Sequence, residues 1–384
     1  MLNDEKKIGL ALSGGGIRAA VFHSGVLKYL AEKGMLEQVS FISTVSGASL
    51  LVGLIYEISK NKFPSSKEYL EDVFPEIEKL LTSKNLQITA IKILIKSFFC
   101  PPNWGDLLNR GNILAKALKC SWKIVNNLQD ISDYPRWVIN GTTQETGKCW
   151  RFSKERMGDY KTGYVINPDI LIADAIAASA AFPPYIDHYK LNVSSYSWKH
   201  YEKDVEFKNA GQPIKVINPN MRSYHITDGG IYDNLATEAV FKKFGEELRD
   251  NINYLIISDA GSALDIREVH LSIFSKTIRN FDIIMAQVVG LRLRAIFRFF
   301  RDNQNTGVIV KIGSTIQHLL EESKKIETAN KIKVEVDDFL IDEDVKKAAE
   351  YPTDLNKIIK QDFNLISRHG YETTKIQMSL YCKS

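Results

Sequence analysis

Two short apolar runs near the N-terminus are each followed by a turn of small residues and then by a helical pattern. Residues 7–12 read as a buried strand, and residues 17 to about 33 read as a helix that ends at Gly34. A second strand at residues 39–44 turns sharply into an apolar stretch that reads as a buried helix. Repetition of strand, turn and helix is typical of proteins in which helices cover a mainly parallel sheet. The chain is therefore predicted to be an α/β protein.

The rest of the chain continues this pattern with more helices. Residues 62–133 are predicted to be mainly helical, with a break at residues 100–105 that contains Trp104. Small residues predict a further helix that Pro183 and Pro184 would stop. Residues 224–244 predict a strand, a loop and a helix. Further buried strands are predicted at residues 137–143, 253–262 and 307–313.

No internal repeat, low-complexity tract or linker divides the sequence. We therefore expect a single domain over residues 1–384, because a chain of this length and 44% hydrophobic composition can bury one large core. Two parts of it are expected to be rich in helix. They are an insertion at about residues 62–133 and a C-terminal part at about residues 264–384.

Composition and charge exclude several classes of function. Lys and Arg number 50 against 46 Asp and Glu, and this even balance does not predict nucleic-acid binding. The four cysteines lie far apart, so neither a zinc site nor a disulfide framework is indicated. The first residues lack the apolar core of a secretory signal, and no run of about 18 apolar residues predicts a membrane span. We expect a cytoplasmic protein that meets lipid, if at all, from the water side.

Ser46 is the first candidate for chemistry. It stands in STVSGAS, between a predicted strand and a predicted buried helix. A nucleophilic serine is often presented by such a sharp turn, with the amide of the next residue, here Gly47, beside it. The usual pattern is G-x-S-x-G, and Thr44 and Ala48 take its outer positions here. Taken alone, the motif is more often an ordinary turn serine than a nucleophile.

Asp228 is the candidate base, because none of the seven histidines stands where a Ser-His-Asp triad would place it. Asp228 follows a predicted strand in ITDGGIYDN, and a carboxylate held against a serine in a dry site can accept its proton. An Asp-Gly turn without a catalytic role explains the same residues. His225 lies three residues earlier, and its ring points away from the loop if it belongs to the strand. His23 is expected to be a packed or capping histidine rather than a catalytic one.

The order of the three turns along the chain indicates that they form one site. SGGGIR, STVSGAS and TDGG each come just after a predicted strand, and open α/β sheets gather the carboxyl ends of their strands along one crevice. Gly14, Gly15 and Gly16 would then offer backbone N–H groups to the oxyanion that forms when a serine attacks an ester. The turn lacks the Gly-Lys-Ser/Thr ending of a phosphate-binding loop, and no cluster has metal-ligand spacing. No metal and no cofactor are expected.

Four blocks in this order resemble the patatin-like phospholipase family. The family's Gly-rich, nucleophile, Ser/Ala/Pro and Asp-Gly-Gly blocks are similar to LSGGGIRAAVFHSGVL, STVSGAS, AIAASAAFPPY and TDGGIYDN respectively. The resemblance implies a three-layer α/β/α fold with a mainly parallel central sheet, related to the α/β-hydrolases. It also implies a Ser-Asp dyad without histidine and the hydrolysis of fatty acyl esters of lipids.

The resemblance assigns a role to each matching residue. It makes Ser46 the nucleophile and Asp228 the base, and Arg18 would help to hold a lipid phosphate. The oxyanion donors would be the amides of Gly14, Gly15, Gly16 and Gly47. We expect an acyl hydrolase of the phospholipase A type with a phospholipid substrate. A lysophospholipase or neutral lipid esterase, and a non-catalytic or partner-gated protein that keeps the fold, stay open, as does the need for a protein or small-molecule activator.

Two stretches indicate how the chain could meet a membrane. Residues 85–99 (NLQITAIKILIKSFF) are apolar around most of a helix, with one narrow polar stripe that contains Lys92 and Lys96. Such a helix either packs into the core or lies on a membrane with its lysines at the phosphates. Residues 290–302 place Arg294, Arg298 and Arg301 on one helical stripe, which is either a solvated face or a contact with anionic lipid.

Overall fold

A computed structural model describes residues 6–99, 109–183, 186–201, 213–219, 221–242, 246–261, 264, 272–326, 330 and 339–382. Five parallel strands form the centre of its sheet. In spatial order these strands are β14 (Gly307–Lys311), β13 (Tyr254–Asp259), β1 (Ile8–Leu12), β2 (Val39–Val45) and β3 (Arg136–Thr143). Their residues are almost all buried, as expected for parallel strands that are covered on both faces. The predicted α/β class and its mainly parallel central sheet are confirmed.

Short antiparallel strands extend the sheet beyond β3. They are β4 (Cys149–Phe152), β5 (Arg156–Asp159), β6 (Gly163–Ile166), β8 (Trp198–His200) and β9 (Lys215–Ile217). Two more, β10 (Ser223–Asp228) and β7 (Tyr189–Asn192), join beside β3, and β11 (Phe241–Lys242) pairs with β12 (Glu247–Leu248). Of this group, the sequence predicts only β10. Strands of two to four residues are too short to show a clear alternation of apolar and polar side chains.

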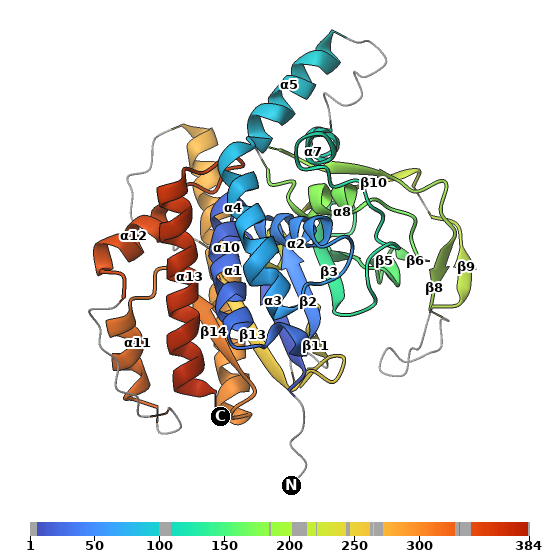
Figure 1. The fold of residues 1–384 in the computed structure, drawn as a ribbon. Coiled ribbons are helices and arrows are strands. Elements are labelled where there is room, and N and C mark those ends of the chain that lie inside the picture. The colour runs from blue at the N-terminus through green and yellow to red at the C-terminus, as the bar shows by residue number, and fades with distance from the viewer. Residues whose placement is uncertain are drawn as a thin grey trace.

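Helices cover both faces of the sheet, which gives three layers (Figure 1). One face is covered by α1 (Gly16–Glu32), α2 (Gly47–Ile58) and α13 (Lys360–Tyr381), and the other by α10 (Ile273–Asp302). Alternate residues of one strand enter the two cores. Leu10 and Leu12 belong to the larger core with Phe22 of α1, whereas Ala11 belongs to a smaller one with Ile296 of α10. The three-layer arrangement that the family resemblance implied is confirmed.

The predicted insertion is mainly helical over its described residues, although residues 123–133 form turns and irregular structure. It comprises α3 (Ser66–Glu68), η2 (Tyr69–Val73), α4 (Phe74–Ser83), α5 (Leu86–Phe98), α7 (Arg110–Ala117) and η4 (Leu118–Trp122). Helix α5 projects from the body of the molecule (Figure 1). The predicted break at residues 100–105, with Trp104, lies outside the described residues. The remaining helices include α8 (Ile172–Ser179), α11 (Ile316–Ser323) and α12 (Asp342–Glu350).

The predicted helix in the second half of residues 224–244 is wrong. Among the described residues of this stretch, only α9 (Gly230–Asp233), a single turn, is helical. The carboxylate of Asp233 accepts hydrogen bonds from the backbone N–H groups of Leu235 and Glu238, at 3.1 and 2.7 Å. Ala236 then adopts φ 58°, which a continuing helix does not allow. Side-chain capping of the backbone therefore replaces the helix with turns.

Among the described helices, none combines the length and the apolar composition that crossing a membrane would require.

Candidate active site

Strands β2 and β10 approach each other along one edge of β3. β2 runs parallel to β3, and its last residue, Val45, lies opposite Asn140. β10 runs antiparallel to β3, and its last residue, Asp228, lies opposite Gly141. Because β4 occupies the other edge of β3 at these positions, β2 and β10 must share the first edge. Ser46 follows Val45 directly, so the register brings Ser46 and Asp228 to the same point of the sheet.

The backbone at Ser46 has the conformation of a strained turn. Its φ of 53° and ψ of −117° are unusual for a residue with a side chain, and helix α2 begins at the next residue. The N–H of Ser46 donates to Ser179 Oγ at 3.0 Å, and Ser179 Oγ donates to the carbonyl of Asn140 at 2.6 Å. Ser179 therefore holds the turn against β3. Ser179 lies in the AIAASAAFPPY block but is not among the site residues predicted from the sequence.

The turn can contain Thr44 because its closest backbone contact is made at another residue. The Thr44 hydroxyl is buried and accepts hydrogen bonds from Ser49 Oγ and Trp137 Nε1, both at 2.9 Å. A Cβ atom on Gly47, by contrast, would come within 2.1 Å of the carbonyl oxygen of Gly16. The residue that must be glycine for the strand and the two helices to approach is therefore Gly47, not the residue at position 44.

Asp228 is held as a buried carboxyl group. Its side chain is 2% exposed, and Oδ1 accepts a hydrogen bond from the N–H of Gly230 at 2.7 Å. Oδ2 is buried and has no hydrogen-bond partner among the described residues. Burial raises the pKa of Asp228 from 3.8 to about 7, and the nearby Ser46 side chain and the Gly230 N–H oppose that rise by favouring the carboxylate. A carboxyl group with this pKa can accept and release a proton near neutral pH.

The three glycines of the turn differ in whether their backbone N–H groups are already hydrogen-bonded. The N–H of Gly14 donates to the carbonyl of Asn234 at 3.1 Å, so this amide is already occupied. Gly16 and Gly47 open helices α1 and α2, and N–H groups at a helix start have no acceptor within their own helix. Gly15 directly precedes α1 with φ 142°. The amides of Gly15, Gly16 and Gly47 are therefore better candidates for oxyanion donors than the amide of Gly14.

Arg18 does not occupy a position from which it could hold a lipid phosphate. Its side chain is 1% exposed, and its guanidinium donates to the carbonyls of Ala349, Tyr351 and Ala260 at 2.8–3.0 Å. Burial lowers its pKa to about 10, and Asp259 opposes this shift. Because α1 is covered by the C-terminal part of the chain, Arg18 joins α1 to that part and to the end of β13. This setting favours a structural role for Arg18 over the contact with lipid phosphate that the resemblance implied.

His23 and His225, the two histidines near the predicted motifs, have hydrogen-bond partners other than Ser46 and Asp228. His23 is buried, and burial lowers its pKa to about 4, so it is neutral. Its ring nitrogens contact Ser258 Oγ at 2.7 Å and the carbonyl of Ser13 at 2.9 Å, which supports the start of the glycine turn. His225 Nδ1 lies 2.7 Å from a carboxylate oxygen of Glu145.

Asn234 is a site residue that the sequence analysis missed. Its backbone carbonyl accepts from Gly14. A Cβ atom added to Gly14 would lie 2.5 Å from the side-chain oxygen of Asn234, and one added to Gly230 would lie 2.7 Å from it. Asn234 therefore lies between the glycine turn and the loop that follows Asp228. Its position in the quoted TDGGIYDN block was the available signal.

We expect Gly16→Ala to impair the site far more than Gly34→Ala. The two glycines have nearly the same φ, 58° and 62°, so the conformational cost of a side chain is similar. A Cβ on Gly16 would lie 2.6 Å from the carbonyl oxygen of Asp354, whereas a Cβ on Gly34 would have nothing within 4 Å. Gly16→Ala should lower lipid esterase activity by about a hundredfold or more and lower the melting temperature below that of Gly34→Ala. Equal activity and stability in the two variants would contradict this assignment.

Known proteins resemble this chain in sequence pattern and in fold. A family model described as patatin-like phospholipase matches residues 10–241. Human GIVD cytosolic phospholipase A2 is similar in structure, with a TM-score of 0.53 and 11% identity over 98% of this chain and 59% of that chain. No curated protein sequence matches the chain.

Two further solved structures are less similar. Human GIVD cytosolic phospholipase A2 in complex with methyl gamma-linolenyl fluorophosphonate and terbium chloride has a TM-score of 0.49, with 12% identity over 98% of this chain and 58% of that chain. VipD from Legionella pneumophila has a TM-score of 0.36, with 14% identity over 98% of this chain and 67% of that chain. The present chain thus spans about 59% of the length of the human enzyme. At this identity the human enzyme's similarity concerns the fold alone.

Proposed function

The chain belongs to the patatin-like phospholipase family, and we propose that it is a phospholipase A type acyl hydrolase that acts through Ser46 and Asp228. The observation that carries this proposal is the meeting of β2 and β10 along β3, which brings a strained serine to a buried carboxyl group with a pKa of about 7. The convergence of Gly16 and Gly47 beside them supports it further. A family of lipid hydrolases supplies the class of substrate.

The proposed reaction has two steps that use the same groups. Asp228 accepts the proton of Ser46 as Oγ attacks the acyl carbonyl, and the amides of Gly15, Gly16 and Gly47 stabilise the tetrahedral oxyanion. Collapse of this intermediate breaks the ester bond, and the leaving alkoxide takes the proton from Asp228. A lyso-lipid departs and an acyl-enzyme remains. Water then gives a proton to Asp228, attacks the acyl group and releases the fatty acid, and the proton returns to Ser46.

Helix α5 is the proposed contact with the membrane. Leu86, Ala90 and Ile93 pack against the main core, so the core-packing interpretation holds for one side of the helix. Ile88, Ile91 and Ile95, at helical spacings of three and four, are about half exposed, at 47%, 48% and 54%. Residues 85–99 contain two lysines and no acidic residue. An exposed apolar stripe flanked by lysines suits the surface of an anionic bilayer.

The base of α5 lies close to the glycine turn. The N–H of Gln87 donates to the carbonyl of Leu355 at 3.1 Å. The preceding residue, Asp354, accepts a hydrogen bond from the N–H of Ile17 at 3.0 Å, directly after Gly16. One short segment thus contacts both the helix and the turn. A membrane bound at α5 would therefore present its lipids at the rim of the candidate site.

We expect replacement of both Ile91 and Ile95 by serine to weaken binding to phosphatidylserine-containing vesicles about 30-fold. Each side chain would lose roughly 1 kcal/mol of interfacial burial, because about half of it is exposed. Vesicle sedimentation in a Ser46→Ala background measures affinity without hydrolysis. The matched control replaces Ile341 and Ile359, which are 62% and 57% exposed, and should bind like the parent protein. Equal affinity in the test and control variants would exclude α5 as the contact.

Lipid mass spectrometry tests the proposed activity. The wild-type protein and Ser46→Ala are incubated with mixed vesicles of phospholipid, lysophospholipid and triacylglycerol. We expect the wild type alone to convert phospholipid into lyso-lipid and fatty acid. Consumption of only lysophospholipid or only neutral lipid would replace the proposal with the corresponding esterase. No product from any lipid, with α5 still binding vesicles, would favour a non-catalytic protein that keeps the fold.

A further inference from the structure

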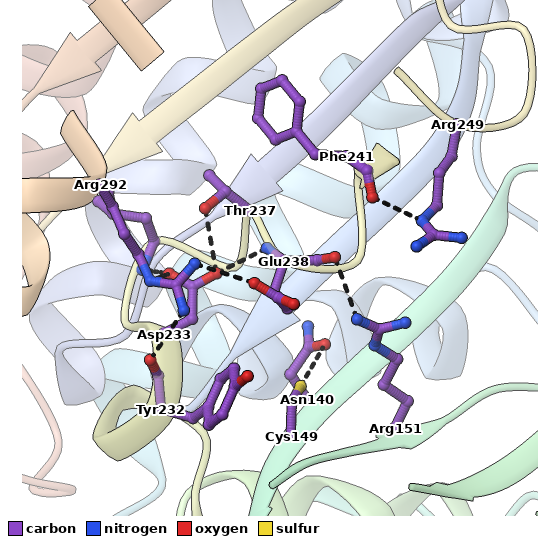
Figure 2. A network of polar contacts seen from close by, with 11 residues as sticks. Asn140, Cys149, Arg151, Tyr232, Asp233, Thr237, Glu238, Phe241, Arg249 and Arg292 are labelled. Carbon is purple, nitrogen blue, oxygen red and sulfur yellow. Dashed lines mark hydrogen bonds and ion pairs between the residues drawn. The ribbon is translucent and has the colours of Figure 1, made fainter. Parts of the chain in front are cut away.

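Four arginines converge on a small pocket away from Ser46. Arg136 begins β3, Arg151 and Arg156 belong to β4 and β5, and Arg249 follows β12. Figure 2 shows the guanidinium groups of Arg151 and Arg249 close together. The rest of the lining is formed by Phe41, Val138, Ser153 and Ala239. Phe41 lies five residues before Ser46 on β2, so the pocket is roughly 17 Å along that strand from the candidate active site.

The hydrogen bonds of this arginine pocket leave most of its charge unpaired. Arg151 Nη2 donates to the carbonyl of Glu238 at 3.0 Å, and Arg249 Nε donates to the carbonyl of Phe241 at 2.8 Å. Arg156 Nη1 donates to the hydroxyl of Tyr201 at 3.1 Å. These acceptors are neutral. In the described part of the chain, no ion pair joins Arg151, Arg156 or Arg249 to a carboxylate.

The two carboxylates beside the pocket both pair with the fourth arginine. Arg136 contacts Glu155 at 3.3 Å and Asp250 at 2.8 Å. Glu238, which also pairs with Arg292, favours the charged form of Arg151 as well. Counted with Arg292, Asp233 and Glu238, five arginines face four carboxylates, which leaves an excess of one positive charge. The neighbouring network in Figure 2 is different, because Arg292 there contacts two carboxylates, those of Asp233 and Glu238, at 3.4 and 3.0 Å. The charge excess is therefore particular to the arginine pocket.

Two further observations indicate that the pocket is incomplete without an anion. Arg151 Nε is buried and has no hydrogen-bond partner among the described residues, and buried polar groups normally have one. Burial, together with the charges of Arg151, Arg156 and Arg136, also holds the pKa of Arg249 below its ordinary value, although Asp250 opposes this effect. Like charges that are held together and partly buried cost stability, which a bound anion would restore.

We propose that the arginine pocket binds the phosphate end of a ligand that carries a phosphate monoester. A phosphate monoester carries enough negative charge to neutralise the excess, and guanidinium groups match phosphate oxygens with paired hydrogen bonds. The cavity between the side chains is small, about 30 Å³, so phosphate oxygens reach the guanidinium groups and the rest of the ligand lies outside. The ligand is either a lipid headgroup or a soluble phosphate compound. The proposal does not depend on hydrolysis at Ser46.

The test uses the full chain with Ser46→Ala, so that lipid is not consumed. Glucose 6-phosphate is the soluble monoester, and phosphatidylcholine vesicles with phosphatidic acid supply the same group on a lipid. Both are titrated at fixed ionic strength against sodium chloride, with calorimetry and thermal unfolding as readouts. We expect one or both to bind and to raise the melting temperature. Binding by glucose 6-phosphate identifies a soluble ligand. Because α5 is itself proposed to bind anionic bilayers, a lipid headgroup is identified only when phosphatidic acid vesicles bind more tightly than phosphatidylserine vesicles and Arg249→Gln removes that difference.

Arg249→Gln should weaken this binding about tenfold or more, because one charged partner of the phosphate is lost. The same variant should melt higher than the parent protein in chloride alone, because repulsion among the arginines is relieved. Arg222→Gln, an equal change of charge at an exposed position just before β10, should affect neither property. If Arg249→Gln does not fold, Arg156→Gln replaces it. Unchanged monoester affinity in the folded pocket variant, or no binding of either probe beyond chloride, would overturn the proposal.

Discussion

Replacing Ser46 by alanine is expected to lower the rate of lipid ester hydrolysis by at least about 10⁴-fold, because loss of a serine nucleophile removes the covalent step. The fold should be retained, since alanine meets the same backbone strain at φ 53° that serine does. The melting temperature should therefore change by no more than a few degrees. Hydrolysis of phosphatidylcholine vesicles and thermal unfolding measure the two quantities.

Ser379→Ala is the control for this experiment. Ser379 lies on the exposed side of α13, where its hydroxyl donates to the carbonyl of Lys375 at 2.8 Å. The Ser379→Ala variant should hydrolyse lipid at the wild-type rate. Activity of Ser46→Ala close to that of Ser379→Ala would exclude Ser46 as the nucleophile.

Asp228→Asn is expected to lose activity to a similar degree and to gain stability. The asparagine side chain has the same shape but cannot accept the serine proton, so a loss of about 10⁴-fold is expected. In the wild type, the rate should rise with pH through about 7, as Asp228 loses its proton. The measurement is kcat/KM for a soluble short-chain ester between about pH 5 and pH 9.

The gain in stability follows from the direction of the pKa shift. The folded state holds the Asp228 proton up to about pH 7, whereas the unfolded state releases it near 3.8. The free energy of unfolding is therefore unaffected below pH 3.8, falls as the pH rises to 7, and stays lowered above it. Asp228→Asn removes this cost, which is on the order of 3–4 kcal/mol for a shift of about three units. Its advantage in melting temperature over the wild type should grow between pH 4 and pH 7. A variant that becomes less stable than the wild type over this range would contradict burial of the acid.

The strands and turns that carry the candidate site could be predicted because each leaves a local pattern. β1 and β2 are apolar runs of five and seven residues, and each is followed by a glycine-containing turn and a long helix. Such elements can be recognised without knowledge of their partners. β4 to β9 are three or four residues long and depend on pairing with one another, which a single sequence does not display.

Roles that depend on distant backbone could not be predicted. Arg18 follows the glycines as the resemblance requires, but its carbonyl acceptors belong to Ala260, Ala349 and Tyr351, far along the chain. The amide of Gly14 is occupied by the carbonyl of Asn234 for the same kind of reason. A sequence shows which side chains are present, whereas carbonyl groups occur at every residue and carry no signal. The charge excess of the arginine pocket likewise exists only after folding.

The pairing of Ser46 with Asp228 is tested most directly by labelling with a fluorophosphonate, which reacts with activated serines, followed by peptide mass spectrometry. The wild-type protein should carry the phosphonate on the peptide that contains Ser46, and the labelling rate should rise with pH through about 7. Asp228→Asn should react at least about a hundredfold more slowly. Labelling of another serine, or equal rates for the wild type and Asp228→Asn, would contradict the proposed dyad.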